Sequence, residues 1–268
     1  MKELTNDQMH RIAPSIFADR PFHEVSDRYR FIPTIDVVEA LRQQGWFPAS
    51  VQESVARLEQ KRGFTRHLVR FRSEGCRVEF DGMLPEIVLV NSHDRGSSFT
   101  LMAGLFRLIC SNGMVVQNAD FGRVRVRHTG HDIMSTIMES VCSISGNVPR
   151  MAEAVDDFQT ITLSPNEQGV FAESAAELRW GRDKETGKLN APFTPDKLLL
   201  ARRQEDKGGS LWHTYNRVQE NMIKGGLRGV SANGRRRVRT RKVSSVSEDV
   251  RLNSALWSLT EKMAQLKA

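Results

Sequence analysis

Short segments with the pattern of β-strands dominate the first half of the chain. Residues 6–12 predict a brief helix, and residues 35–44 predict a second one with Thr34 as its N-cap and Gly45 at its end. Beyond these helices the apolar residues, rich in Val, Ile and Phe, come in short runs separated by turn residues, which favours antiparallel strands. The strand segments are WFPASVQESVARL (46–58), TRHLVRFRS (65–73) and PEIVLVNSHD (85–94).

The pattern is less regular between residues 97 and 130. SSFTLMA (97–103) predicts a further strand, whereas GLFRLICSNG (104–113) fits a short helix that ends at Asn112 and Gly113. MVVQNADFGRVRVRHTG (114–130) returns to a strand pattern, with a turn at residues 118–122.

Helical spacing takes over in the second half. Apolar residues recur every three or four positions from Ile133 to Phe158, which predicts a helical hairpin or one long helix with a kink at Pro149. A helix starting after Ser164 has the capping-box pattern with Glu167. Three more helical segments follow, at residues 194–203, 210–226 and 247–268.

These patterns predict an α+β chain, with an antiparallel β-sheet bearing basic hairpins in the N-terminal half and a helical C-terminal half. We expect residues 1–130 to form a helix plus antiparallel sheet core. Residues 131–268 should form a helical region, interrupted by a basic loop at 224–245 and packed on the same core.

Charge is concentrated in that loop. The net charge is +7, and removing the six cations of GRRRVRTRKV (234–243) leaves only +1. A local cationic block favours contact with a polyanion, although a solvated loop that aids solubility is the alternative. The loop is rich in glycine, so we expect a flexible arm whose phosphate contacts are sensitive to salt and tolerant of sequence.

Arginines also alternate with apolar residues along two of the predicted strands. In residues 66–72 and again in residues 123–127, every second position is mostly arginine, so each strand would present an arginine face with side chains about 6.6 Å apart. A solvent-facing side of a sheet is the alternative. The candidate nucleic-acid-binding residues are therefore Arg66, Arg70, Arg72, Arg123, Arg125, Arg127, Lys224, Arg228, Arg235, Arg236, Arg237, Arg239, Arg241 and Lys242.

Candidates for chemistry and base stacking are few. His93 and Asp94 lie at a strand end and could start a nuclease site, but no known catalytic or metal-binding motif surrounds them, and a hydrogen-bonded turn explains the segment. We therefore assign no catalytic residue, no metal and no cofactor. Trp212 and Trp257 lie in amphipathic helices and are expected in the core.

The cysteine pattern and the absence of a leader favour the cytoplasm. The three cysteines are widely spaced, and no signal peptide or transmembrane run is visible, so we expect free thiols in a bacterial cytoplasm.

Four segments resemble one family of mobile-element proteins. FIPTIDVVEALRQQGWFP, PEIVLVNSHDRGSSF, FRLICSNGMV and LWHTYNRVQENMIKGGL are similar to the YfjQ/YafZ/YubP-like proteins of prophages and conjugative plasmids, from about Ala13 to the C-terminus. The resemblance implies a prophage or plasmid setting and supplies no activity.

The order of elements also resembles the core of single-strand annealing recombinases of the Rad-type, Redβ and Erf classes. That resemblance implies a basic groove, to which Arg66, Arg70 and Arg72 would contribute, and rings or filaments that hold single strands. The shared residues are only the Gly-Trp after the helix at 35–44 and the turn at Asn112 and Gly113.

We therefore expect a protein that binds and anneals single-stranded DNA, self-associates and needs no ATP, in recombination or DNA maintenance. A protein-interaction factor that counters a host defence or nuclease is the alternative, and a metal-dependent nuclease is third.

Overall fold

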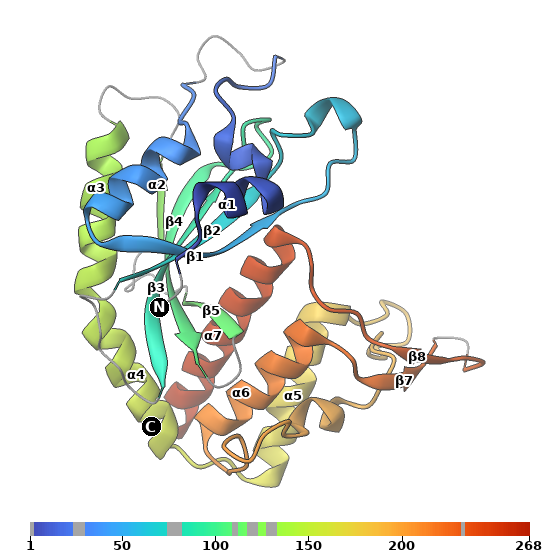
Figure 1. The fold of residues 1–268 in the computed structure, drawn as a ribbon. Helices are drawn as coiled ribbons and strands as arrows, with labels where there is room; N and C mark the ends of the chain where they lie inside the picture. Colours follow the sequence, from blue (N-terminus) through green and yellow to red (C-terminus); the bar gives the residue numbers. More distant parts are fainter. Residues whose placement is uncertain are drawn as a thin grey trace. The chain divides into compact units, whose positions relative to one another are not determined.

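A computed structural model describes residues 3–23, 30–73, 82–108, 112–116, 123–126, 133–231 and 234–268. The chain forms two compact units, Met1–Arg150 and Met151–Ala268. The first holds an antiparallel sheet with helices, and the second is mainly helical (Figure 1). The α+β class expected from the sequence is confirmed.

The first unit consists of six strands and the helices around them. Its helices are α1 (Asn6–Ile12), η1 (Pro14–Phe17), α2 (Thr34–Gln43), η2 (Glu59–Lys61), α3 (Ile133–Gly146) and the start of α4 (Val148–Thr160). Its strands are β1 (Trp46–Glu53), β2 (His67–Ser73), β3 (Met83–Asn91), β4 (Phe99–Arg107), β5 (Asn112–Val116) and β6 (Arg123–Val126).

All strand pairs in this sheet are antiparallel, in the order β1-β2-β3-β4-β5, and β6 also pairs with β4. The two short strands share one edge of β4: β5 pairs with Ala103–Arg107 and β6 with Phe99–Met102. Because directly opposite residues share a face, this register determines which arginines of β2 and β6 lie on the same side.

Residues Gly104–Arg107 belong to β4 and residues 112–113 to β5, so the helix expected over 104–113 is wrong for these described residues. Residues Gly104–Arg107 pair with β3 on one side and with β5 on the other. A Cβ at Gly104 would lie 2.8 Å from Val88 Cγ2 and 3.0 Å from the carbonyl oxygen of Met114, so glycine permits the close approach of the strands. Pairing with two neighbours overrides the local pattern, which alone does not separate a buried strand from a helix.

Helix α2 begins where expected but not by the expected cap. Pro33 occupies the N-cap position, and no side chain caps the helix. The hydroxyl of Thr34 instead lies 2.8 Å from Nε2 of His67 in β2 and accepts a hydrogen bond from Nδ2 of Asn91 in β3 at 3.1 Å. Thr34 therefore links the start of α2 to the sheet and does not cap the helix.

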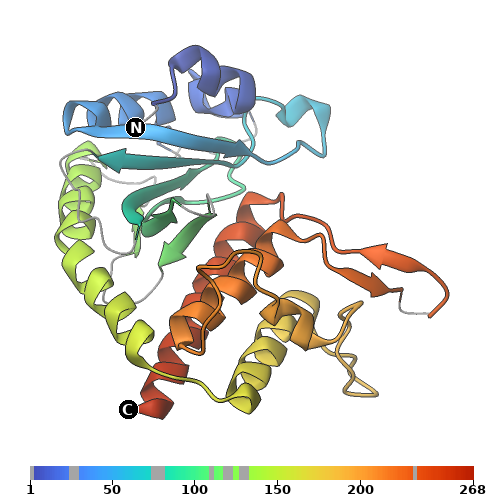
Figure 2. The same ribbon diagram turned by 60° about the horizontal axis from the view of Figure 1, so that its bottom comes forward.

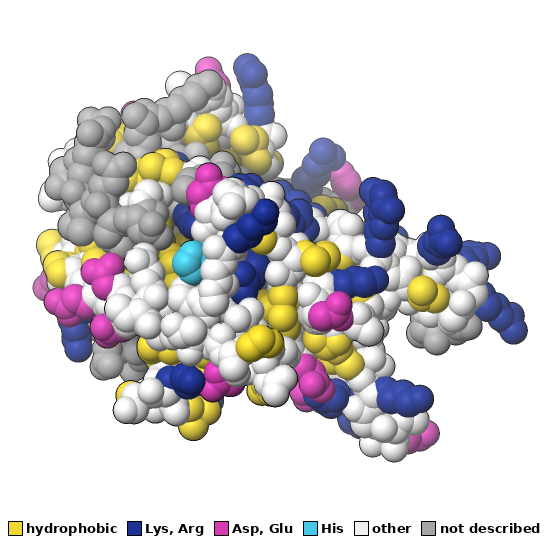
Figure 3. Space-filling view, turned by 90° about the horizontal axis from the view of Figure 1, so that it is seen from below, with side chains coloured by type: hydrophobic (Ala, Val, Ile, Leu, Met, Phe, Trp, Pro, Cys, Tyr) yellow, Lys and Arg dark blue, Asp and Glu magenta, His cyan; other side chains and the backbone are white. Residues whose placement is uncertain are grey.

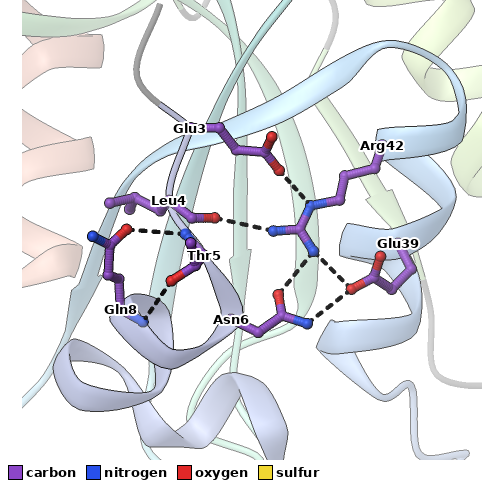
Figure 4. Close-up of polar contacts among 7 residues, drawn as sticks. All are labelled: Glu3, Leu4, Thr5, Asn6, Gln8, Glu39 and Arg42. Atoms are coloured by element: carbon purple, nitrogen blue, oxygen red, sulfur yellow. Dashed lines mark hydrogen bonds and ion pairs between the residues drawn. The ribbon is translucent and has the colours of Figure 1, made fainter.

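Arg42 links α2 to the N-terminal segment (Figure 4). Its guanidinium donates to Glu3 at 2.8 Å and to Asn6 at 2.8 Å, to Glu39 at 2.7 Å, and to the carbonyl oxygen of Leu4 at 3.0 Å. These four contacts use the fixed fork of donors that only arginine offers.

The second unit packs helices against one another, and its elements after α4 are α5 (Pro165–Trp180), η3 (Pro195–Leu199), α6 (Leu211–Lys224), β7 (Arg228–Val230), β8 (Arg237–Arg239) and α7 (Val246–Lys267). Helix α6 is buried over almost its whole surface, and Trp212 and Trp257 are 2% and 0% exposed, as expected of core residues. Figures 1 and 2 show α5, α6 and α7 side by side.

Several helix predictions are refined here. The apolar stripe from residue 133 to 158 forms two consecutive helices separated at Asn147, and Pro149 lies in the first turn of α4, where proline is tolerated. The capping box of Ser164 and Glu167 is confirmed. The segment 194–203 forms only the 3₁₀ turn η3, and the helices expected at 210–226 and 247–268 are confirmed as α6 and α7.

Candidate nucleic-acid interface

The basic segment 224–245, which the sequence predicts as a loop, contains the two strands of a β-hairpin. Strands β7 and β8 pair with Arg228 opposite Arg239, Gly229 opposite Val238 and Val230 opposite Arg237. At the turn, the amide of Ser231 donates to the carbonyl oxygen of Arg236 at 2.8 Å, and the amide of Arg236 donates to Oγ of Ser231 at 3.1 Å. The β7–β8 hairpin, called the ribbon below, therefore presents these cations on two hydrogen-bonded strands and the turn between them.

Glycines allow the ribbon to leave α6. Gly225 ends the helix with φ of 64°, and its amide donates to the carbonyl oxygen of Asn221 at 3.2 Å. A Cβ at Gly225 would lie 2.5 Å from the carbonyl oxygen of Arg241, so the returning strand passes too close for any other residue.

Backbone hydrogen bonds close the base of the ribbon. The amide of Gly226 donates to the carbonyl oxygen of Thr240 at 2.8 Å, and the amide of Thr240 donates to that of Leu227 at 2.9 Å. The amide of Val243 donates to the carbonyl oxygen of Ile223 at 2.9 Å. The hydroxyl of Thr240 accepts from the amide of Leu227 at 3.0 Å.

Neighbouring elements of the same unit hold the base further. Arg179 of α5 donates to the carbonyl oxygens of Met222 and Arg241, the latter at 2.6 Å. Burial lowers the pKa of this guanidinium from its ordinary value. The amide of Val230 donates to Pro192 at 2.6 Å, and Nζ of Lys197 donates to the carbonyl oxygen of Arg228 at 3.0 Å.

Most cations of the ribbon lie in solvent. Arg228, Arg235, Arg236, Arg237, Arg239, Arg241 and Lys242 are all exposed. Arg235 has a further contact, and the other six form no ion pair with any residue in the described ranges. Residues 224–245 contain no acidic side chain, so the positive charge is not balanced from within the segment. In Figure 3, dark blue side chains gather on the arm that projects at the right, where Figure 1 places β7 and β8.

Lys224 differs from the rest of the predicted set. It is half-buried at the end of α6, and its Nζ lies 2.9 Å from a carboxylate oxygen of Glu220 one turn earlier. That carboxylate also pairs with Arg203. Lys224 is therefore part of a structural ion-pair group rather than of the open ribbon.

The arginines of β2 are engaged inside the first unit. Arg70 is only 4% exposed, and it donates to one carboxylate oxygen of Glu86 at 2.9 Å, while Arg72 donates to the other at 2.8 Å. The guanidinium of Arg72 also lies over the ring of Phe106, and Arg66 donates to the carbonyl oxygen of Gly96. The solvent-exposed arginine face expected on this strand is therefore wrong for Arg70 and Arg72.

Glu86 is the residue that the sequence reasoning missed. It is 1% exposed in β3, two positions from Val88, which lies directly opposite Arg70. A buried carboxylate requires partners. The acidic residue directly before the apolar run IVLV could therefore have indicated that the arginines of the neighbouring strand are paired.

The register places Arg125 of β6 on the same sheet face as the β2 arginines. Arg125 lies opposite Thr100, Thr100 opposite Val90, and Val90 opposite Leu68, which shares a face with Arg70. Strands β3 and β4 separate the two sets, a distance of about 14 Å. Arg125 is exposed, the side chain of Arg123 is outside the described part, and Arg127 lies outside the described residues.

His93 and Asp94 do not form an open catalytic pair. His93 is 0% exposed, and its ring centroid lies 4.7 Å from that of Phe31, with the two rings tilted by 57°. Asp94 accepts hydrogen bonds from Lys61 at 3.4 Å and from the amide of Gly96 at 2.8 Å. Asp94 therefore organises a turn.

The ring atoms of His93 join a buried network with His67 and Thr34. Nδ1 of His67 lies 3.0 Å from the carbonyl oxygen of Thr65 and must donate to it, so Nε2 accepts the hydroxyl proton of Thr34. Nε2 of His93, at 3.3 Å from the same hydroxyl, is then a donor. Burial lowers the pKa of His67 to about 4, so this imidazole is neutral at physiological pH.

Within the described ranges, no group of three or more His, Cys, Asp or Glu side chains is placed to hold a metal ion. Within the same part of the chain, no helix has the length and apolar character needed to cross a membrane.

Comparison with known proteins establishes the kinship. Residues 21–257 match the family model described as Domain of unknown function (DUF932). The UPF0380 proteins YfjQ and YafZ of Escherichia coli (strain K12) are each 38% identical to the chain over 263 residues, which cover 98% of this chain and 92% of each relative.

The chain belongs to the DUF932 family. The resemblance to YfjQ and YafZ expected from the sequence is thus confirmed. No solved structure matches this DUF932 protein significantly. The similarity to annealing recombinases stays a prediction. Since the family description and these relatives' names state no activity, function has to be argued from the site.

Proposed function

We propose that this DUF932 protein binds nucleic acid through the β7–β8 hairpin, as part of recombination or DNA maintenance in a prophage or plasmid, without ATP and without making or breaking a bond. The observation that carries the proposal is the set of seven exposed cations on one ordered ribbon that contains no acidic residue.

Electrostatics supports this use of the ribbon. Six of its seven exposed cations are arginines, whose planar forks bind phosphate oxygens bidentately. Contacts with phosphates release condensed counterions, which gives affinity without sequence preference and makes it fall steeply with salt. Like charges held this close repel one another, so a polyanion that joins them gains the relief of that repulsion.

The first unit supports the proposal less. Glu86 engages Arg70 and Arg72, and only Arg125 of the described β6 side chains offers an exposed guanidinium on that sheet face. The hairpin therefore carries the interface, and the β2 arginines act in the fold.

The proposal is tested by fluorescence anisotropy with labelled single-stranded and duplex oligonucleotides at 50 and 200 mM salt. For an interface of six contacts, affinity should fall by about a thousandfold between these salt concentrations. Absence of binding to either form at 50 mM would overturn the proposal and favour the alternative, a protein partner with an acidic surface.

The nuclease reading has no supporting observation, because His93 is buried and Asp94 is bonded within its turn. Strand cleavage that requires a divalent metal and disappears in His93→Ala would contradict this.

A further inference from the structure

The side chains of the ribbon are sorted onto two faces. Opposite residues share a face, so Arg228, Arg237 and Arg239 lie on one side together with Val230, while Gly229 and Val238 lie on the other. A Cβ at Gly229 would collide with the backbone of Pro192. The glycine face is therefore turned to the body of the unit, and the arginine face is turned to solvent.

The arginine face of the ribbon, which Pro192 does not cover, is long enough to lie along a groove. From the pair Leu227 and Thr240 at its base to Ser231 and Arg236 at its turn, four residue steps span about 13 Å. The major groove of B-form DNA is about 8.5 Å deep and about 12 Å wide, and it admits a two-stranded ribbon, whereas the minor groove is only about 6 Å wide. The backbone hydrogen bonds at the base hold the ribbon in this form before any partner arrives.

The chemistry of the ribbon also differs from that of single-strand binders. Proteins that capture single strands stack bases on aromatic side chains, and residues 224–245 contain none. Arginine, by contrast, is the side chain that most often reads guanine O6 and N7 in the major groove. Exposed arginines on a narrow, hydrogen-bonded ribbon without aromatic residues therefore suit a duplex.

We infer that the β7–β8 hairpin enters the major groove of duplex DNA, with Arg237 and Arg239 facing the base edges and Arg235 and Arg236 at the turn contacting phosphates. This inference rests on the proposed function and names its substrate class. The single-stranded DNA expected from the sequence becomes an outcome of the test.

The test measures anisotropy with three labelled probes at 100 mM salt. These are a 24-base-pair duplex of mixed sequence, one of its strands alone, and the same duplex whose cytosines carry glucosylated hydroxymethyl groups, which fill the major groove. Netropsin, which occupies the minor groove, is added to the plain duplex in a parallel titration. We expect the plain duplex to bind at least tenfold more tightly than the other two probes, and netropsin to change its affinity less than twofold.

Variants place the effect on the ribbon. R237Q/R239Q should lose at least tenfold in affinity for the plain duplex and should no longer distinguish the glucosylated one. K207Q/K262Q removes two exposed charges of the same unit from other elements and should retain the discrimination. If R237Q/R239Q unfolds, as judged by circular dichroism, R235Q/R236Q replaces it. This variant should lose affinity for the plain duplex but should still distinguish it from the glucosylated duplex.

The outcomes separate this inference from the proposed function. Equal binding of plain and glucosylated duplex, tighter binding of the single strand, or displacement by netropsin would overturn the major-groove inference, and nucleic-acid binding would stand. Failure of all three probes to bind would overturn both. If R237Q/R239Q distinguishes the plain from the glucosylated duplex as well as the wild type does, the ribbon is not the element that enters the major groove.

Discussion

At the scale of residues, two buried polar groups in the first unit determine how the sheet is held. Glu86 joins the arginines of β2, and the imidazole of His67 joins α2 to β2 through Thr34. The sequence pattern gives the face of a strand residue but not the partner that covers it, because the partner comes from a distant segment.

Replacing Glu86→Gln should destabilise the protein strongly. The substitution keeps the size of the side chain but leaves two buried guanidiniums without a carboxylate, which costs about 3 kcal/mol in the free energy of unfolding. Urea denaturation monitored by circular dichroism measures the loss. Glu39→Gln, whose carboxylate is 47% exposed beside Arg42, is the control and should cost less than about 1 kcal/mol. Equal losses in the two variants would mean that Glu86 is not a buried partner.

His67 should make the protein sensitive to mild acid. Its folded pKa of about 4 lies below the ordinary 6.5, so the unfolded chain takes up a proton at a pH where the folded chain does not. Stability contributed by neutral His67 is present above pH 6.5 and is lost as the pH falls toward 4, by about 3 kcal/mol in total.

Urea midpoints at pH 7.5, 6 and 5 measure this loss. His67→Gln should flatten the dependence between pH 6.5 and 5, whereas His10→Gln, at an exposed position of α1, should leave it unchanged. A slope that is the same in wild type and His67→Gln would assign the acid sensitivity to other groups.

At the scale of elements, the strongly periodic segments were predictable and the short ambiguous ones were not. The 3.6-residue repeat gave α3, α4, α6 and α7, and the capping box gave the start of α5. Residues Gly104–Arg107 were misassigned because their strand character depends on pairing with β3 and β5. The β7–β8 hairpin was missed because glycine has little strand propensity, and because the hydrogen bonds from Arg179 and to Pro192 involve another part of the chain.

The lack of a side chain at Gly229 should determine where the β7–β8 hairpin lies against Pro192. Gly229→Ala places a Cβ against the backbone of Pro192, so the ribbon has to move away and lose the hydrogen bond from Val230. We expect faster hydrogen exchange at the amides of Val230 and Thr240 and a DNA affinity that falls by roughly tenfold, about 1.4 kcal/mol. The melting temperature should change little, because Gly229 lies in β7 and outside the helices α5, α6 and α7 that pack together.

Gly146→Ala is the matched control, since its Cβ would meet no atom within 4 Å and its φ is not positive. This variant should keep both the exchange rates and the affinity of the wild type. An affinity of Gly229→Ala equal to that of the wild type would show that the position of the ribbon against Pro192 is unimportant for binding.

At the scale of the whole molecule, the cationic excess of the sequence is located in the second unit. The six cations between residues 235 and 242 account for nearly all of the net charge of +7, and all six are exposed on or beside the ribbon. The sequence predicted this segment as the main basic feature but also weighted the β2 arginines, which Glu86 engages. Self-association into rings or filaments stays a prediction that light scattering can test.

The salt dependence of duplex binding measures directly whether the hairpin is the interface. The logarithm of the association constant is followed against the logarithm of salt concentration for the wild type and for R235Q/R236Q/R237Q/R239Q. A matched variant, K184Q/K188Q/K207Q/K262Q, removes four exposed charges of the same unit outside the hairpin. If the four arginines contact phosphates, their loss should make the slope shallower by roughly 3 to 4 units, and the lysine variant should keep the wild-type slope. A hairpin variant with the wild-type slope, or a lysine variant that changes as much, would contradict the assignment of nucleic-acid binding to the β7–β8 hairpin.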